Sequence, residues 1–313
     1  MTTMKAVRIH GYGGLEVLAY EEAPCPDVKE DEVLIQVFAA GVNPFDWKVR
    51  EGYLAGWFNH PLPLILGWDV SGVIQGVGSG VTNFTIGEAV FSRADVSRDG
   101  AYAEYVSVLA DNVVPKPRSL DHVHAAAIPH AALAAWQSLF DTAGLTAGQT
   151  VLIHGAAGGV GHFAVQFARL RGARVIGTSS GHNLDFLREL GVDEAIDYTT
   201  TQFEEVVRDA DVVLDTIGGE VLQRCWTVLK PGGFLVSLVE VPSEETAIVH
   251  GVRQALATAK ADAKTLTEIT ALVDSGQVKP TVSTVLPLPE VRQAHALNQS
   301  MHTRGKIVLQ IVN

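Results

Sequence analysis

The sequence predicts an α/β protein in which a doubly wound, parallel-sheet domain is inserted between two pieces of a β-rich domain. Its 313 residues exceed the size at which a single core usually stops growing. Short β-type runs fill about the first 120 residues, and apolar strands then alternate with helical segments, as in βαβ units. After Pro280 the β-type pattern returns. We therefore assign residues 1–123 and 276–313 to the β-rich domain and 124–275 to the parallel-sheet domain.

The β-rich domain is predicted from period-two apolar runs that Gly, Pro and Asn interrupt. Helical patterns are scarce in this part of the chain. The runs are DEVLIQVFAAGV, VSGVIQGVGSGV, GEAVFSR and AYAEYVSVL, and GKIVLQIV near the end of the chain completes the domain.

The inserted domain is predicted from apolar runs with helical segments between them. The segment VGHFAVQFARLRG places Val160, Phe163, Ala164 and Phe167 on one helix face. DAKTLTEITALVDSG predicts a helix that Gly276 ends. The predicted strands are TVLIHG, ARVIGTSS, EAIDY, DVVLDTIGG and FLVSLVE, with a further strand in GVRQALATA.

Charge and cysteine content exclude several classes of function. Lys and Arg number 23 and Asp and Glu 35, which gives a net charge of −12 without blocks of one sign. Such a surface repels phosphate backbones and anionic lipid, so we expect no nucleic-acid or membrane partner. Cys25 and Cys225 lie too far apart for a disulfide framework or a metal spacing. Together with an N-terminus that lacks the pattern of an export signal, this predicts a cytoplasmic protein.

A glycine-rich turn between a strand and a helix predicts a dinucleotide site. In HGAAGGVGHFAV, the residues Ala156, Gly158 and Gly161 stand where a GxGxxG fingerprint has its glycines. Gly158 allows the backbone to approach a pyrophosphate, Gly161 allows close packing of helix on strand, and the helix N-terminus offers unpaired N–H groups. Ala156 departs from the pattern, and a purely structural turn is the alternative. Gly159 and Val160 complete the predicted contact segment.

The end of the next strand predicts NADPH rather than NADH. An acid that would hold a free ribose 2′-OH is expected about 20 residues beyond the fingerprint. The region GTSSGHNLDFL has its first acid, Asp185, several residues late. Its neutral donors would not repel a 2′-phosphate, although capping of the next helix is the alternative role. They are Thr178, Ser179, Ser180 and Asn183, with His182 as the one potential cation of the loop.

Several segments together resemble the medium-chain dehydrogenase/reductase superfamily, in its zinc-free quinone oxidoreductase and enone reductase branch. They include GVNPFDWKVREGYL, PLILGWDVSGVIQGVGSGVTNFTIGEAVFSR, GAAGGVGHFAVQFA, VLDTIGGE and HTRGKIVL. The resemblance implies a GroES-like catalytic domain around an inserted Rossmann domain, with NADPH as hydride donor. It also implies a quinone or α,β-unsaturated carbonyl as acceptor and a homodimer, for which the edge of the sheet near GVRQALATA is a candidate. Ala at the first fingerprint position is familiar in this branch.

The resemblance also bears on zinc. Zinc enzymes of the superfamily place a Cys and a His where this chain has Asn43 and Trp68, and neither side chain is a zinc ligand. We therefore expect no metal site. His130 falls near the place of a third ligand, so we assign it to the substrate pocket as a donor of a proton or hydrogen bond, with a core or surface histidine as the alternative.

Without a metal, the protein has to place donors where negative charge develops on the substrate oxygen. Lys48 is the first candidate and Tyr53 the second, against an exposed lysine and a packing tyrosine. Asn43 is expected to bind the nicotinamide ribose or the substrate, or else to form an Asx turn before Pro44. Trp47, Trp57 and Trp68 are candidate pocket walls, with core positions as the alternative. By resemblance and strand-end position, Tyr198, Thr216 and Val239 are further cofactor contacts.

Three functions remain open at this stage. The first is a zinc-free, NADPH-dependent reductase of quinones or enones. The second is a reductase dedicated to one biosynthetic intermediate, which would ignore simple acceptors. The third is a non-catalytic protein that binds NADPH and oxidises none of it, because one fold hosts many functions.

Overall fold

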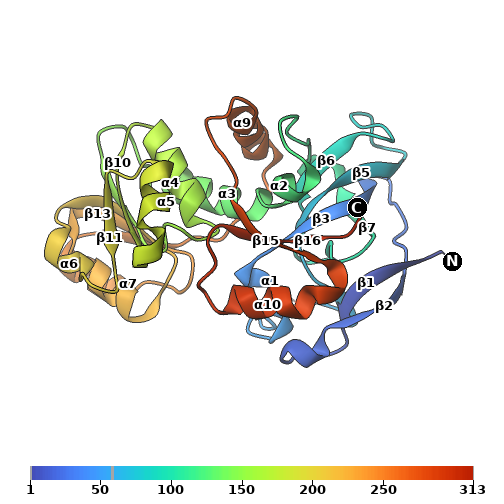
Figure 1. The fold of residues 1–313 in the computed structure, drawn as a ribbon, viewed down its shortest axis with the longest axis horizontal. Helices are drawn as coiled ribbons and strands as arrows, with labels where there is room; N and C mark the ends of the chain where they lie inside the picture. The colour runs from blue at the N-terminus through green and yellow to red at the C-terminus, as the bar shows by residue number, and fades with distance from the viewer. Residues whose placement is uncertain (1, 58–59, 313) are drawn as a thin grey trace. The chain divides into compact units, whose positions relative to one another are not determined.

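The computed structural model describes residues 2–57 and 60–312, and the chain forms two compact units (Figure 1). The first unit holds the residues up to His130, then Ala261–Gly276, and the residues from Pro280 onward. The second unit holds Ala131–Lys260 and Gln277–Lys279. An α/β fold with one domain inserted in another, as the sequence predicts, is therefore confirmed.

The second unit is built on six parallel strands in the order β11-β10-β9-β12-β13-β14. From β9 the chain moves outward on one side to β11, and then returns to β12 on the other side and moves outward again. Right-handed crossovers therefore place the helices of the two halves on opposite faces of the sheet. The β9–β12 junction is the point at which strand order reverses, and such points bind ligands at the carboxyl ends of the strands.

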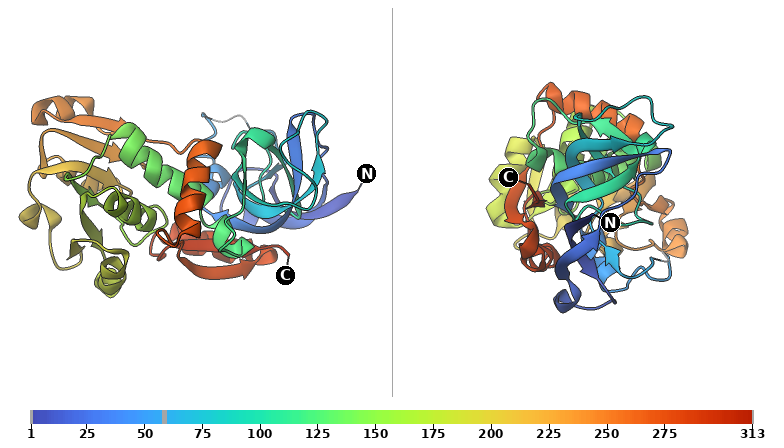
Figure 2. Two further views of the ribbon diagram at one scale, coloured as in Figure 1. Left: turned by 90° about the horizontal axis from the view of Figure 1, so that it is seen from above. Right: turned by 90° about the vertical axis from the view of Figure 1, so that its right-hand side faces the viewer.

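The elements of the second unit follow the predicted segments, including the strand expected in GVRQALATA. The strands are β9 (Thr150–Ile153), β10 (Arg174–Ser179), β11 (Glu194–Asp197), β12 (Ala210–Asp215), β13 (Leu229–Ser237) and β14 (Arg253–Leu256). The helices are α4 (Gly161–Leu170), α5 (Leu184–Leu190), α6 (Phe203–Val206), α7 (Gly219–Cys225) and α8 (Glu244–His250), and α3 (Pro129–Trp136) leads into the unit (Figures 1 and 2).

The first unit contains a seven-stranded sheet and a three-stranded sheet in the described part of the chain. Strand β3 is the longest and pairs with β5, β7 and β16, so it brings distant segments together. The large sheet runs β15-β16-β3-β5-β6-β8, and the small one runs β2-β1-β4.

The elements of the first unit confirm the predicted β-rich character. Its strands are β1 (Thr3–Ile9), β2 (Ala19–Pro24), β3 (Glu32–Val42), β4 (Leu64–Ile65), β5 (Asp69–Val77), β6 (Ala89–Arg93), β7 (Tyr105–Leu109), β8 (Val113–Pro115), β15 (Val282–Pro287) and β16 (Lys306–Gln310). Its helices are α1 (Pro44–Arg50), α2 (His122–Ala126), α9 (Ala263–Asp274) and α10 (Val291–Gln299).

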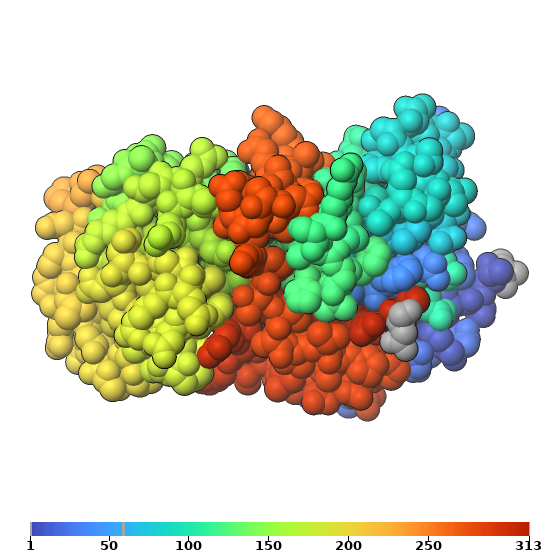
Figure 3. All heavy atoms as spheres, turned by 45° about the horizontal axis from the view of Figure 1, so that its top comes forward, coloured from blue at the N-terminus to red at the C-terminus, as the bar shows by residue number. Residues whose placement is uncertain are grey.

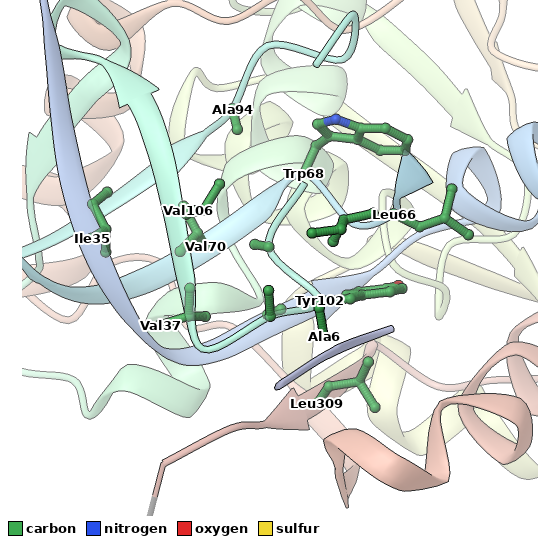
Figure 4. Packing of buried hydrophobic residues seen from close by; sticks show 14 of the residues in the cluster. Ala6, Ile35, Val37, Leu66, Trp68, Val70, Ala94, Tyr102, Val106 and Leu309 are labelled. Carbon is green, nitrogen blue, oxygen red and sulfur yellow. The ribbon is translucent and has the colours of Figure 1, made fainter. Parts of the chain in front are cut away.

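The core of the first unit lies between its strands and is shown in Figure 4. Ile35 and Val37 from β3 pack with Val70 from β5, and none of the three is exposed. Two large rings, Trp68 and Tyr102, belong to the same cluster. Removal of this apolar surface from water is the main favourable term in folding.

Helix α9 belongs to the first unit, whereas the sequence prediction placed it in the inserted domain. The helix packs on β8, and Asp274 at its end accepts a hydrogen bond of 2.8 Å from the Ser119 hydroxyl. In Figure 3 the orange α9 segment lies against the green segment that follows β8. The contacts thus divide the chain at 130/131 and 260/261 rather than at 123/124 and 275/276. Each helix of the described residues is too short or too polar to cross a bilayer.

Candidate functional site

The predicted catalytic loop begins at the junction of β3 and α1. Asn43 is the N-cap of α1, and Pro44 follows at the first helical position, where a missing N–H costs nothing. The backbone N–H of Asn43 donates to Asp46 Oδ2 over 2.8 Å. This bond is one half of a capping box between Asn43 and Asp46.

The Asn43 side chain is held by two buried charges. Its Nδ2 donates to Asp69 Oδ2 over 2.8 Å, and its Oδ1 accepts from Lys306 Nζ. Lys306 also donates to the Val42 carbonyl (2.9 Å) and lies 3.8 Å from Asp69. Burial raises the pKa of Asp69 and lowers that of Lys306, and each charge opposes the shift of the other. The Asn43 amide is therefore fixed in one orientation, and one of its two N–H groups is free of these partners.

Asp46 is a second buried carboxyl of the same region, and the sequence did not single it out. Its Oδ2 accepts a hydrogen bond from the Tyr102 hydroxyl over 2.7 Å, as well as the one from the Asn43 N–H. Burial raises the pKa of Asp46 to about 7, although these two hydrogen bonds oppose the rise. Asp46 therefore changes its protonation near neutral pH.

His130 lies beside this group. Its backbone N–H donates to Asp69 Oδ1 over 2.7 Å, so Asp69 joins His130 and Asn43 through its two oxygens. On the ring, Nδ1 accepts from Arg93 Nε over 3.2 Å. The Phe45 ring lies 6.2 Å from the His130 ring between centroids. Burial, followed by the charge of Arg93, holds the pKa of His130 well below its usual value.

The two predicted oxyanion donors lie on and after α1. Lys48 is partly buried, with Nζ 5.8 Å from the centre of the Trp47 ring, and burial lowers the pKa of Lys48. Tyr53 packs edge-on against the same indole at 6.1 Å and is 66% exposed. Lys48 and Tyr53 therefore pack on the same indole, and the sequence prediction did not include this shared partner.

Trp57 and Trp68, the other tryptophans predicted as pocket walls, occupy different environments. Trp68 is buried, donates from Nε1 to the Arg98 carbonyl over 2.9 Å, and packs edge-on against Phe45 at 5.3 Å. Trp57 is 71% exposed. Trp68 thus belongs to the core that supports Phe45, and Trp57 does not pack into this unit.

The described residues contain no group of three or more His, Cys, Asp or Glu side chains that could hold a metal ion. Of the two residues that the resemblance compared with zinc ligands, Asn43 has its amide in the network above and Trp68 has its indole in the core.

In the second unit, the glycine-rich turn shows why Ala156 is tolerated. The left-handed backbone conformation falls on Gly155, whose φ is +63°, one residue before Ala156. Ala156 is buried, and its N–H donates to the Thr178 carbonyl of β10 over 3.0 Å. A Cβ on Gly161 would lie 2.2 Å from the Gly155 carbonyl oxygen, so α4 can approach the turn only with glycine there. The packing role predicted for Gly161 is therefore present in this structure.

Gly158, Gly159 and Val160, which directly precede α4, are partly exposed. His162 Nδ1 lies 2.9 Å from the Gly158 carbonyl oxygen, and since a carbonyl only accepts, Nδ1 carries the proton. This bond occupies the carbonyl of Gly158, and the Gly158 N–H donates to the Gly155 carbonyl over 2.9 Å, so the N–H groups of Gly159 and Val160 are those that an anion would meet.

The predicted 2′-phosphate residues divide into buried and accessible members. Thr178 and Ser179 are buried, and Thr178 Oγ1 lies 3.0 Å from His154 Nδ1. Ser180 is partly exposed and lies within 3.5 Å of His182 Nε2. Asn183 is buried, and its Nδ2 donates to the Ser180 hydroxyl over 3.4 Å. Ser180, His182 and Asn183 are therefore gathered in one loop, as the sequence suggested.

An acid that the sequence prediction missed lies against this loop. Asp197 ends β11 and pairs in register with Ser179 of β10. Its carboxylate accepts from the N–H and hydroxyl of Thr199 and from the Gly181 N–H, which lowers the pKa of Asp197. Asp197 is the acid of the segment EAIDY, but only the pairing of β10 with β11 shows that this side chain reaches the loop after β10.

The remaining predicted cofactor contacts lie at the ends of strands. Thr216 Oγ1 donates to the His154 carbonyl over 2.8 Å, Val239 is 37% exposed, and Tyr198 is 54% exposed. Asp215 at the end of β12 is fully buried and bonds to groups that follow β12 and to the end of β13. Its Oδ1 accepts the N–H groups of Ile217 and Gly218 at 2.9 Å each, and its Oδ2 accepts from Ser237 over 2.8 Å.

Comparisons with known proteins agree with both units. The family description "Alcohol dehydrogenase GroES-like domain" matches residues 29–118, and "Zinc-binding dehydrogenase" matches residues 190–309. The chain is 36% identical to the chloroplastic NADPH-dependent alkenal/one oxidoreductase of Arabidopsis thaliana, over 98% of this chain and 79% of that protein. It is 34% identical to a mitochondrial NAD(P)H oxidoreductase of Danio rerio, over 99% and 92% of the two chains.

Solved structures of quinone oxidoreductases also match nearly the whole chain. The quinone oxidoreductase of Coxiella burnetii matches with a TM-score of 0.93 and 33% identity, over 99% of this chain and all of that one. The Escherichia coli quinone oxidoreductase, solved in complex with NADPH, matches with a TM-score of 0.89 and 26% identity, over 98% and 99% of the chains.

Proposed function

Because the chain belongs to the zinc-free quinone oxidoreductase branch of the medium-chain dehydrogenase/reductase superfamily, we propose that it reduces quinones or α,β-unsaturated carbonyls with NADPH. It is an oxidoreductase that uses a nicotinamide cofactor. The use of NADPH rather than NADH, and of quinones or α,β-unsaturated carbonyls as acceptors, is the part that we propose.

The observation that carries the proposal is the turn from Gly155 to Gly161. Its geometry fits a dinucleotide because Gly161 leaves room for close approach of α4, and Gly158 to Val160 stay accessible at the helix N-terminus. When bound there, NADPH supplies the hydride. Ser180 offers a partly exposed neutral hydroxyl to a 2′-phosphate, and the Asp197 carboxylate against the same loop is already bonded to Thr199 and to the Gly181 N–H, so we favour NADPH over NADH.

The residues of the first unit would then act on the acceptor. In an enone, the β-carbon gains the hydride, the π electrons move to the carbonyl oxygen, and a proton from water completes reduction at the α-carbon. Lys48 is proposed as the main donor to the oxygen while it carries negative charge, with Tyr53 second. Asn43, which two buried charges hold in place, has one amide N–H left to orient a ligand.

The test is oxidation of NADPH by the purified protein in the presence of a panel of acceptors. The panel contains a benzoquinone, a naphthoquinone, a short 2-alkenal and a cyclic enone, with a saturated ketone as control. We expect turnover with quinones or with the unsaturated carbonyls and none with the ketone. Binding of NADPH without oxidation by any acceptor would refute the proposal in favour of a non-catalytic role.

The cell compartment is also proposed rather than established. Relatives are described as mitochondrial or chloroplastic. For this chain we propose the cytoplasm, since Cys25 and Cys225 are both free thiols. Fractionation of the source cells tests this directly.

A further inference from the structure

The imidazole of His130 is held in one tautomer by a partner that can only donate. Arg93 Nε lies 3.2 Å from His130 Nδ1, and a guanidinium has no acceptor and keeps its charge in proteins. Nδ1 must therefore accept, and in a neutral ring the proton lies on Nε2. A second proton on Nδ1 would face the Arg93 cation directly, so the imidazolium form is disfavoured by geometry as well as by burial.

The cations near the ring also disfavour the imidazolium form of His130. Arg93 on β6 and Lys306 on β16 both lower the pKa of His130, after the larger effect of burial. Asp69 on β5 uses Oδ1 for the His130 backbone N–H and Oδ2 for Asn43, so both of its oxygens already have other partners than the ring nitrogens. Asp46 on α1 is protonated over much of the range below neutral pH, because its pKa lies at about 7. Both the donor at Nδ1 and the surrounding charges therefore favour the neutral ring.

The Nε2 side of the ring remains open. Nε2 has no hydrogen-bond partner among the described residues and is not one of their fully buried unpartnered atoms, and His130 as a whole is mostly but not completely covered. The neighbouring ring of Phe45 comes from the first turn of α1, the helix that also carries Lys48, the first proposed donor to the acceptor. A neutral N–H donor thus lies at an accessible position next to an apolar ring.

We propose that His130 donates a hydrogen bond from Nε2 to the carbonyl oxygen of the acceptor, and that Arg93 positions it as the neutral Nε2–H tautomer. His130 keeps its proton in this role. It stabilises the oxygen as charge accumulates there and is not the acid that protonates the product. This inference rests on the proposed function, because the acceptor oxygen is its target.

The tautomer can be tested without any turnover. In a ¹⁵N-labelled protein, long-range ¹H–¹⁵N correlations of the histidine rings distinguish Nδ1 from Nε2 protonation, and His130→Gln identifies the His130 signals among those of the 11 histidines. We expect the Nε2–H pattern from about pH 5.5 to 8 without titration. Arg93→Met should release the ring, so that a titration appears closer to the usual histidine pKa of about 6.5. An Nδ1–H pattern, or a wild-type ring that titrates near that value, would overturn the inference.

Kinetics test the role itself. His130→Leu removes the donor and should lower kcat by about 10²-fold, with a smaller change in the KM of the acceptor. His130→Gln keeps an N–H donor of similar reach and should recover most of that loss. The pH profile of wild-type kcat should show no step that His130→Gln removes. Wild-type kcat in His130→Leu would overturn this inference alone, whereas a wild-type protein that reduces no acceptor would overturn the proposed function as well.

Discussion

Lys48 lies on α1 with its ammonium above the Trp47 indole, and burial already lowers its pKa. Lys48→Met keeps much of the length and the apolar stem but removes the donor. Loss of one preorganised donor to an oxyanion costs about 10² to 10³ in turnover, or roughly 3 to 4 kcal/mol. We expect that loss in kcat, with the affinity for NADPH little changed, as measured by steady-state kinetics and by fluorescence titration.

Tyr53→Phe is the matched control for this experiment, because it deletes only a hydroxyl from a side chain that packs on the same indole. A normal kcat in Lys48→Met together with a loss in Tyr53→Phe would reverse the two roles. Full activity in both variants would show that other groups, such as His130, meet the oxygen.

Ser180 is an accessible hydroxyl of the loop proposed to receive the 2′-phosphate, and Asp197 already places one carboxylate against that loop. Ser180→Asp adds a second negative charge where the phosphate would lie. We expect NADPH to bind more weakly by about tenfold or more while NADH changes little, since like charges at close range cost on the order of 1 to 3 kcal/mol. Titration calorimetry with both cofactors measures the ratio.

The matched variant is Ser180→Asn, which keeps the size of the new side chain without its charge. An equal loss of affinity in the Asp and Asn variants would assign the effect to bulk. Equal affinity of the wild-type protein for NADPH and NADH would show that neutral donors do not select between them.

Helix α4 depends on Gly161 for its approach to the turn. The Cβ of Gly161→Ala would lie 2.2 Å from the Gly155 carbonyl and 2.6 Å from Ala156 Cα, which are backbone atoms that cannot move independently. We expect a loss of about 1 to 3 kcal/mol in unfolding free energy and a large loss of NADPH affinity. Urea unfolding and cofactor titration measure the two effects.

Gly144→Ala provides the comparison, because it also replaces a glycine of the second unit but has open space around its Cβ, with strain only from its φ of +66°. It should lose stability without a comparable loss of cofactor affinity. Wild-type NADPH affinity in Gly161→Ala would contradict the assignment of this turn.

Strand β14 forms an edge of the six-stranded sheet, and the preceding helix exposes apolar side chains beside it. Ile248 and Val249 are 73% and 77% exposed, and no further strand of the described residues pairs with β14. An open edge next to exposed apolar groups is a site for pairing with a second copy. We expect a homodimer with twice the 33.4 kDa mass of the chain in light scattering.

The double variant Ile248→Lys with Val249→Lys should be monomeric, whereas Ile86→Lys, at another apolar residue that is 63% exposed, should remain dimeric. A single-chain mass for the wild-type protein at micromolar concentration would refute the dimer. A dimer that survives the double variant would move the interface elsewhere.

Acid stability of the molecule is expected to depend on its buried histidines. Burial, followed by the charge of Arg224, lowers the pKa of His154 to about 3, whereas an unfolded histidine binds a proton below about 6.5. Between these values the unfolded chain binds the extra proton, so stability falls as pH falls, by about 1.4 kcal/mol per pH unit at most. His154→Phe, which keeps a ring to pack against Phe203, should flatten this dependence.

Urea unfolding at pH 7.5, 6 and 5 measures the change, with His302→Asn at an exposed position as the control. The difference between wild type and His154→Phe should shift in favour of the variant as pH decreases. A difference that stays constant with pH would contradict the buried neutral histidine.

Most helices and strands could be predicted from local patterns in the sequence. Strand and helix periods, the helix end at Gly276 and the glycine turn before α4 depend on near neighbours in the chain, so β9, α4, β14 and α9 could all be predicted from the sequence. The candidate donors Lys48 and Tyr53 and the loop from Ser180 to Asn183 could be named for the same reason. Their contacts with Trp47 and Asp197 could not be predicted, because spacing alone did not show which side chains would face them.

Only the tertiary structure decided how the buried polar group is assembled. Lys306 reaches Asn43 across 263 positions of the chain because β16 pairs with β3 at Val42, and Asp69 arrives opposite Gly41 on β5. The pairing of β5 with β6 sets Arg93 opposite Asp69, and Arg93 then reaches the His130 ring. Strand register determines these neighbours, and register depends on the packing of whole sheets. The sequence by itself therefore determined which side chains were available for chemistry, and the sheets decided which of them are charged, which are neutral and which face one another.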